Sequence, residues 1–77
     1  MNKAIIYTKP HCTFCNQAKA IFESNNIEYK ERDISDPSIR HELLTKLPSV
    51  KTVPQIYYDG QYIGGYSDLE KFMEEQH

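Results

Sequence analysis

Cys12 and Cys15 are the only two cysteines of the chain, and they stand in the sequence Cys12-Thr13-Phe14-Cys15 between an apolar run and a helical pattern. Two thiols three positions apart at the start of a helix can close into a disulfide and open again. A disulfide that closes so short a loop adds only roughly 2 kcal/mol in the chain-entropy model. We therefore interpret the pair as a reversible redox site and not as a structural crosslink.

The place of Cys12 at a helix N-terminus favours its charged form. The thiolate is the attacking species in disulfide exchange, and unpaired backbone N–H groups and the helix dipole stabilise an anion at this end of a helix. We expect the sulfur to accept hydrogen bonds from the N–H groups of Phe14 and Cys15. Lys9 adds positive charge nearby. Because Cys15 lies one turn further and faces the core, Cys12 is predicted to attack and Cys15 to resolve.

Metal binding and inert packing are the alternatives to redox chemistry. A zinc site needs about four ligands, and only His11, His41 and His77 remain to complete a set with the cysteines. Their spacing matches no familiar zinc motif, so no metal-ligating residue is predicted. His11 is interpreted as a loop residue that mildly tunes the thiol site.

Size and charge limit the other functional classes. The 77 residues, 39% hydrophobic and 26% charged, predict one small globular domain over residues 1–77. A net charge of -2 without a cluster of Lys and Arg argues against nucleic acid, and no apolar run approaches the ~18 residues of a membrane span. No secretory signal is apparent, so we expect a cytoplasmic protein. In that reducing compartment a CxxC pair is more often redox-active or metal-binding than structural.

The first half of the chain alternates between strand and helix around the cysteines. Lys3 to Thr8 is a β-rich run that predicts a buried strand. From Thr13 to about Asn25 the apolar spacing predicts an amphipathic helix, and Asn25-Asn26 can end it in a left-handed conformation. The apolar positions of that helix are Ala18, Ile21 and Phe22. Residues 27–33 predict a second strand that is polar enough to lie at a sheet edge.

A second helix is predicted after this strand. Asp36 can cap it, Pro37 suits its first position, and Pro48 stops it. Its predicted buried face comprises Ile39, Leu43, Leu44 and Leu47.

A hairpin and a third helix complete the chain. Asp59-Gly60 between the β-rich runs 55–58 and 61–63 favours a tight primed turn. The last helix is predicted to have Ser67 as its N-cap, because Ser67 and Glu70 have the spacing of a capping box. Its predicted inner residues are Leu69, Phe72 and Met73. The resulting order β-α-β-α-β-β-α predicts an α/β fold with a mixed sheet, in which the first two strands are parallel.

Two loops could take part in binding. In Thr52-Val53-Pro54 the proline can simply begin a strand. The stretch Gly64-Gly65-Tyr66-Ser67-Asp68 can be an ordinary loop that enters a helix. A helix N-terminus behind glycines is also a ready site for a carboxylate, and Asp68 could accept from an ammonium group. A ligand with both groups on one carbon would suit this loop.

Three separated segments together resemble the glutaredoxins. They are Tyr7-Thr8-Lys9-Pro10-His11-Cys12-Thr13-Phe14-Cys15, then Thr52-Val53-Pro54, and then Gly64-Gly65-Tyr66-Ser67-Asp68. The similarity runs from about Lys3 to Phe72. It implies a thioredoxin-like fold, with a four-stranded mixed sheet flanked by helices, and a glutathione-dependent thiol–disulfide oxidoreductase that reduces protein disulfides and glutathione mixed disulfides.

The resemblance also implies which residues bind glutathione, as a co-substrate and not as a tightly bound cofactor. Val53 would pair through its backbone with the cysteinyl part, next to a cis proline. The loop after the two glycines would hold the γ-glutamyl end, and Lys9, helped by Lys51, would meet the glycyl carboxylate. The full implied set is Lys9, Phe14, Thr52, Val53, Pro54, Gly65, Tyr66, Ser67 and Asp68.

Two other functions stay open on the sequence. One is an electron donor to ribonucleotide reductase that is served by thioredoxin reductase; the loop from Gly64 to Asp68 argues against it. The other is an iron–sulfur or metal-binding module, which two cysteines per chain would permit. The expected partners are glutathione and disulfide-containing or glutathionylated proteins, with ribonucleotide reductase as one possibility, and the chain is expected to be a monomer.

Overall fold

The computed structural model describes residues 3–75 and has the predicted order of elements. In chain order these are β1 (Ala4–Thr8), α1 (Thr13–Ser24), β2 (Tyr29–Asp33), α2 (Pro37–Lys46), β3 (Gln55–Tyr58), β4 (Gln61–Gly64) and α3 (Tyr66–Glu75). The expected β-α-β-α-β-β-α arrangement is confirmed.

The four strands form one mixed sheet in the order β2-β1-β3-β4. β1 and β2 are parallel, whereas β3 runs antiparallel to both β1 and β4. The polar strand β2 lies at an edge, as its composition predicts. The α/β fold with a four-stranded mixed sheet is therefore confirmed.

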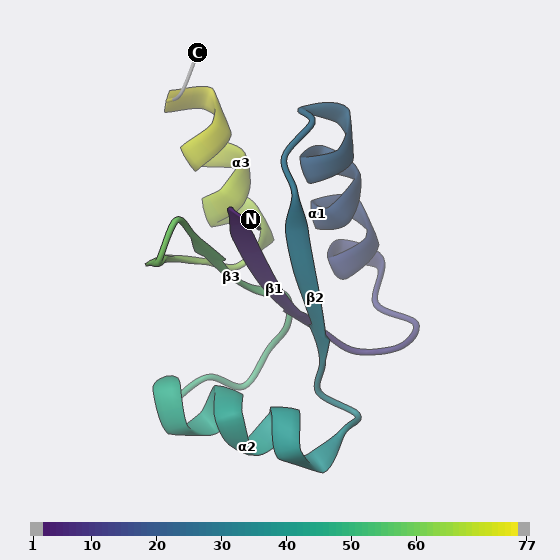
Figure 1. Ribbon diagram of the computed structural model, residues 1–77, viewed down its shortest axis with the longest axis vertical. Helices are drawn as coiled ribbons and strands as arrows, with labels where there is room; N and C mark the ends of the chain where they lie inside the picture. The colour runs from purple at the N-terminus through teal and green to yellow at the C-terminus, as the bar shows by residue number, and fades with distance from the viewer. Residues whose placement is uncertain (1–2, 76–77) are drawn as a thin grey trace.

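The helices are placed unequally around this sheet. α1 and α3 contact each other and run alongside the strands, while α2 lies apart from them across the end of the sheet where β1 and β2 finish (Figure 1). The core lies between the sheet and the two paired helices. Its fully buried members are Ala4, Ile6, Ala18, Phe22, Ile56 and Leu69.

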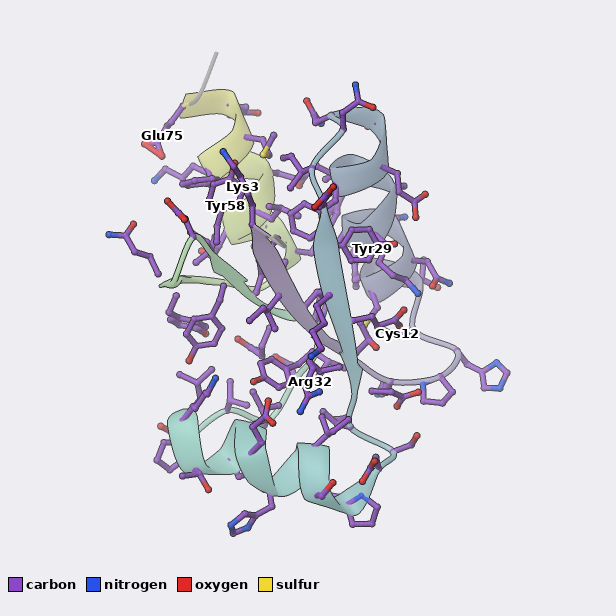
Figure 2. All side chains as sticks on the ribbon, viewed as in Figure 1. Lys3, Cys12, Tyr29, Arg32, Tyr58 and Glu75 are labelled. Atoms are coloured by element: carbon purple, nitrogen blue, oxygen red, sulfur yellow. The ribbon has the colours of Figure 1, made fainter. Side chains whose placement is uncertain are left out.

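The predicted apolar face of α2 is wrong in part. Only Leu43 is buried, Ile39 and Leu47 are half-buried, and the side chain of Leu44 is 40% exposed. Polar contacts attach this helix to the sheet instead. Glu42 accepts a hydrogen bond from the Tyr7 hydroxyl and forms a two-pronged ion pair with Arg32, and Figure 2 shows Arg32 between β2 and α2.

The turns follow the sequence closely. Asp59 and Gly60 have φ values of 52° and 84°, the left-handed pair that a primed hairpin turn requires. Asn26, with φ 56°, takes the left-handed position just after α1. Asp36 caps α2 by accepting from the Ser38 N–H at 2.9 Å.

The predicted N-cap of α3 is wrong by two residues. The helix begins at Tyr66, so Gly65 and not Ser67 precedes it. The Gly65 N–H donates to Asp68 Oδ2 at 3.0 Å, and the Gly65 carbonyl accepts from the Leu69 N–H. An acid at the third helical position reaches back to the N-cap amide. Asp68 therefore fills the role that the sequence suggested for Glu70.

No helix within residues 3–75 combines the length and the apolar character that crossing a membrane demands.

Candidate thiol site and ligand groove

Cys12 caps the N-terminus of α1 with its sulfur (Figure 2). Its backbone is extended, with φ -108° and ψ 108°, and its Sγ accepts from the Cys15 N–H at 3.2 Å. The expected second donor, the N–H of Phe14, makes no hydrogen bond to Sγ within the described part of the chain. An N-cap acceptor reaches the amide two or three positions on, and here it takes the third. Cys12 is buried with 9% of its surface exposed, so its side chain is only slightly accessible.

Cys15 is buried, as its position one turn further predicts. It is 1% exposed. Burial, together with the hydrogen bond and the charge of Cys12, raises the pKa of the Cys15 thiol to about 11. The two thiols are thus chemically unequal: the sulfur of Cys12 accepts a hydrogen bond from an amide and is slightly exposed, and Cys15 is a neutral thiol that is almost fully buried.

The Thr52-Val53-Pro54 segment lies against this thiol. The peptide bond between Val53 and Pro54 is cis, as the resemblance implies. The Cys12 thiol donates to the Val53 carbonyl across 3.9 Å. The fold therefore brings together two segments that are 41 positions apart in the sequence.

A groove of about 480 Å³ opens on one side of Val53. This volume lies within the roughly 300–1,000 Å³ of small-molecule sites. Phe14 and Tyr66 form part of its wall, with ring centroids 5.4 Å apart. Every residue of the implied glutathione set except Lys9 lines it: Phe14, Thr52, Val53, Pro54, Gly65, Tyr66, Ser67 and Asp68, together with Gln55 and Tyr62.

The far end of the groove is the N-terminus of α3. Asp68 uses Oδ2 for the Gly65 N–H, and a carboxylate has further acceptor capacity on its second oxygen. Gly64, with φ 123°, precedes this turn, and a Cβ there would lie 2.4 Å from Asp68 Oδ2. The loop therefore needs glycine at this position to hold the carboxylate beside the groove.

A second, smaller hollow lies on the other side of Thr52 and Val53, which line both spaces. Its volume is about 140 Å³. Lys9 lines this hollow and not the groove, and Lys51 lies with it. The complete lining is Lys9, Ile34, Arg40, Leu43, Leu44, Val50, Lys51, Thr52 and Val53. We refer to this space as the basic hollow.

Sequence reasoning missed Gln55, Tyr62 and Arg40. Gln55 is buried; its Nε2 donates to the Thr52 carbonyl at 2.9 Å, and its Oε1 accepts from the Tyr62 hydroxyl at 2.6 Å. It therefore fixes Thr52 beside the groove. A polar residue directly before the apolar Ile56 of a central strand was the available signal. Nothing in the sequence marked Arg40, because its distance to Lys9 depends on how α2 is placed.

The remaining candidate residues are His11 and the side chains that could bind a metal ion. His11 is exposed in the loop before α1, where it takes a left-handed φ of 58°. Among residues 3–75, no three side chains of His, Cys, Asp or Glu come close enough together to hold a metal ion.

Comparison with known proteins places the chain in a family. The glutaredoxin family model matches residues 4–63. Glutaredoxin 3 of Escherichia coli K12 is 41% identical over 64 residues, which cover 83% of this chain and 77% of that protein.

Solved structures agree on the fold. The crystal structure of glutaredoxin 1 from Francisella tularensis, complexed with cacodylate, superimposes with a TM-score of 0.80 at 32% identity and covers 95% of this chain and 93% of that one. A buckwheat glutaredoxin–glutathione complex superimposes with a TM-score of 0.82 at 22% identity, covering 97% of this chain and 71% of that chain. This chain therefore belongs to the glutaredoxin family and is a glutathione-dependent thiol–disulfide oxidoreductase.

Proposed function

We propose that Cys12 is the attacking thiol of this enzyme and that the groove beside it holds glutathione. The observation that carries the proposal is the position of the Cys12 sulfur, which the Cys15 amide holds at 3.2 Å and which lies 3.9 Å from the Val53 carbonyl. An amide and a helix N-terminus favour a thiolate. The sulfur thus lies beside Val53, a residue that lines both the groove and the basic hollow.

In this proposal glutathione binds across the two spaces in one orientation. Its cysteinyl part pairs with the backbone of Val53, so that its sulfur faces Cys12. Its γ-glutamyl end lies at the α3 N-terminus, where backbone amides take the carboxylate and Asp68 takes the ammonium group. Its glycyl carboxylate reaches Lys9 in the basic hollow. The lining residues of both spaces support this placement.

The reaction with a glutathionylated protein needs only one thiol of the enzyme. The Cys12 thiolate attacks the glutathione sulfur; a disulfide forms between Cys12 and glutathione, and the substrate leaves as a thiolate that takes a proton from water. A second glutathione, as its thiolate, then attacks the glutathione sulfur of this adduct. Oxidised glutathione leaves, and Cys12 is a thiolate again.

Protein disulfides follow a branch that uses the second thiol. Cys12 attacks one sulfur of the substrate disulfide, and Cys15 then displaces the substrate by forming a disulfide with Cys12. Two glutathione molecules reduce this disulfide. Such chemistry belongs to a reducing compartment that is rich in glutathione, and we propose the cytoplasm as its place. Ribonucleotide reductase is one candidate among the protein substrates.

The test is adduct formation with oxidised glutathione. We expect Cys15→Ser to gain the mass of one glutathionyl group and to keep deglutathionylation activity while losing dithiol reduction. Cys12→Ser should gain no mass and lose all activity. Full activity of Cys12→Ser would contradict the proposal.

A coupled assay identifies the reductant. Turnover with glutathione and glutathione reductase should exceed turnover with thioredoxin reductase alone. The reverse ranking would favour the electron donor that thioredoxin reductase serves.

A further inference from the structure

The basic hollow contains more positive charge than a single glycyl carboxylate needs. Lys9, Arg40 and Lys51 line it, and no Asp or Glu does. Within residues 3–75 none of these three side chains forms an ion pair, whereas Lys19 pairs with Glu31 at 3.1 Å. Cations that a protein leaves without counter-ions on one surface attract anionic partners.

The wall of the basic hollow is apolar beneath these cations. Leu43 and Leu44 come from α2, and Ile34 and Val50 come from the loops on either side of it. Leu44 is 40% exposed, whereas Leu43 and Leu69 are buried. Glycine has no side chain to place against such a wall. An aliphatic stem that ends in a carboxylate, as in glutamate, would use both the wall and the cations.

The position of the hollow determines which residue of a substrate could reach it. The hollow and the groove share Thr52 and Val53, next to the Cys12 sulfur. In glutathione the cysteinyl N–H and C=O both belong to amide bonds, as in any protein. A protein cysteine can pair with Val53 with its backbone running in the same direction as that of glutathione. The residue that follows this cysteine then lies where glutathione places glycine. This step rests on the proposed function.

We propose that the basic hollow selects protein disulfide substrates in which the reacting cysteine is followed directly by glutamate. The Cys12 thiolate attacks the sulfur of that cysteine, and a disulfide forms between the two. The former disulfide of the substrate breaks, and the departing sulfur leaves with the electron pair and takes a proton from water. The glutamate carboxylate lies among Lys9, Arg40 and Lys51 during this attack, while its stem contacts Leu44.

The experiment compares peptides that differ at one position. Three peptides with blocked ends carry Cys-Glu, Cys-Gln or Cys-Lys in otherwise identical sequences, each cysteine being joined to 2-mercaptoethanol in a mixed disulfide. The Cys15→Ser protein traps the peptide on Cys12, and quenched mass spectrometry gives the rate constant. Dividing by the rate with dithiothreitol removes intrinsic differences between the peptides. Cys15→Ala is run in parallel, in case a hydroxyl disturbs the buried position.

We expect the corrected rate for Cys-Glu to exceed that for Cys-Lys about tenfold at low salt, with Cys-Gln between them. The ratio of the Cys-Glu rate to the Cys-Lys rate should decrease in about 0.5 M salt, because salt screens the interaction between the charges. Arg40→Gln should decrease this ratio as well. Lys71→Gln removes the same charge from an exposed position on α3 outside the hollow, and it should leave the ratio unchanged.

Equal corrected rates for the three peptides would overturn this inference. If oxidised glutathione still adds to Cys12 in that case, the proposed function stands and only the selection fails. If neither glutathione nor any peptide adds to Cys12, the proposed function itself fails.

Discussion

At the scale of single residues, the two cysteines differ because their surroundings differ. Cys12 is 9% exposed and has an amide on its sulfur, whereas Cys15 is 1% exposed and has its pKa raised to about 11 by burial and by Cys12. A thiol with so high a pKa is almost entirely protonated at neutral pH. On the proposed function, Cys12 therefore attacks external disulfides, and the rate of resolution by Cys15 is limited by the loss of its proton.

This difference predicts a pH dependence for the second step. The rate at which Cys15 displaces glutathione from the Cys12 adduct should rise about tenfold per pH unit below the pKa of Cys15, because only its thiolate attacks. Free glutathione released from the isolated adduct, in samples quenched with acid, measures the rate. The Cys15→Ser adduct is the control and should release none. A rate that is flat between about pH 6 and 8 would contradict the prediction.

Gly64 offers a second prediction at this scale. A methyl group there would lie 2.4 Å from Asp68 Oδ2, and φ is 123°. Gly64→Ala must therefore displace the carboxylate that holds the Gly65 N–H. We expect a loss of about 2–3 kcal/mol in the free energy of unfolding, measured with urea, and a raised KM for glutathione.

Gly60→Ala is the matched control. Its φ of 84° is also left-handed, but nothing lies within 4 Å of a Cβ there. Gly60→Ala should lower the free energy of unfolding by only about 1 kcal/mol and leave the KM for glutathione unchanged. Equal effects of the two substitutions would show that contact with Asp68 has no part in the result.

At the scale of elements, α2 is the helix that is attached to the rest of the fold mainly by polar contacts. It contributes only Leu43 to the buried interior. Its main attachment to the sheet is the cluster in which Glu42 meets both Arg32 of β2 and the hydroxyl of Tyr7 of β1. Because α2 carries Arg40 and Leu44, this cluster also positions one wall of the basic hollow.

Glu42→Gln should therefore loosen α2. The neutral amide cannot replace the ion pair with Arg32, whose two side chains are 27% and 32% exposed. We expect a loss of about 1–2 kcal/mol in the free energy of unfolding, given the partial exposure. Glu74→Gln, at an exposed position of α3, is the control. Thermal melting followed by circular dichroism would detect the difference, and equal melting temperatures would argue against the role of the cluster.

The sequence predicts best what local chemistry decides. The Asp59-Gly60 turn, the left-handed Asn26 and the Asp36 cap each depend on neighbours within a few positions, and all three are found. The proximity of Cys12 to Val53 followed only from a resemblance, because it joins distant segments.

The two errors have different physical causes. The burial expected for Leu44 assumed that α2 turns toward the core by its own apolar pattern, but the contacts of Glu42 with Tyr7 and Arg32 attach this helix to the sheet. No pattern within α2 contains that information.

The cap expected at Ser67 was a wrong choice between two local signals. Gly65 and Asp68 have the same spacing as Ser67 and Glu70, and the structure uses the first pair.

At the scale of the whole molecule, ionisation limits stability at both ends of the pH range. Hydrogen bonds with Arg32 and Tyr7 lower the pKa of Glu42 below its usual 4.5, so its contribution is present above that value and is lost as acid protonates the carboxylate. Burial raises the pKa of Tyr7 above its usual 10.0, and a hydrogen bond to Glu23 together with burial raises that of Tyr29 to about 12. These hydroxyls stabilise the fold below about pH 10, and that contribution is lost above it.

The free energy of unfolding should accordingly fall above pH 10. The unfolded chain releases the tyrosine protons near pH 10, whereas the native state keeps them. Urea titrations at about pH 8 and 11 would measure the loss, and Tyr7→Phe should make it smaller. Tyr58→Phe is the control, since the Tyr58 hydroxyl makes no side-chain hydrogen bond within residues 3–75. A loss of the same size in wild type and in Tyr7→Phe would contradict the prediction.

The sulfur of Cys12 closes the first turn of α1 by accepting the Cys15 amide, and the proposed function assigns the attack to the same atom. On that proposal, reactivity and helix capping share one acceptor. A disulfide sulfur carries no charge and accepts hydrogen bonds less strongly than a thiolate. The N-terminus of α1 should therefore be held less firmly in the mixed disulfide than in the free enzyme.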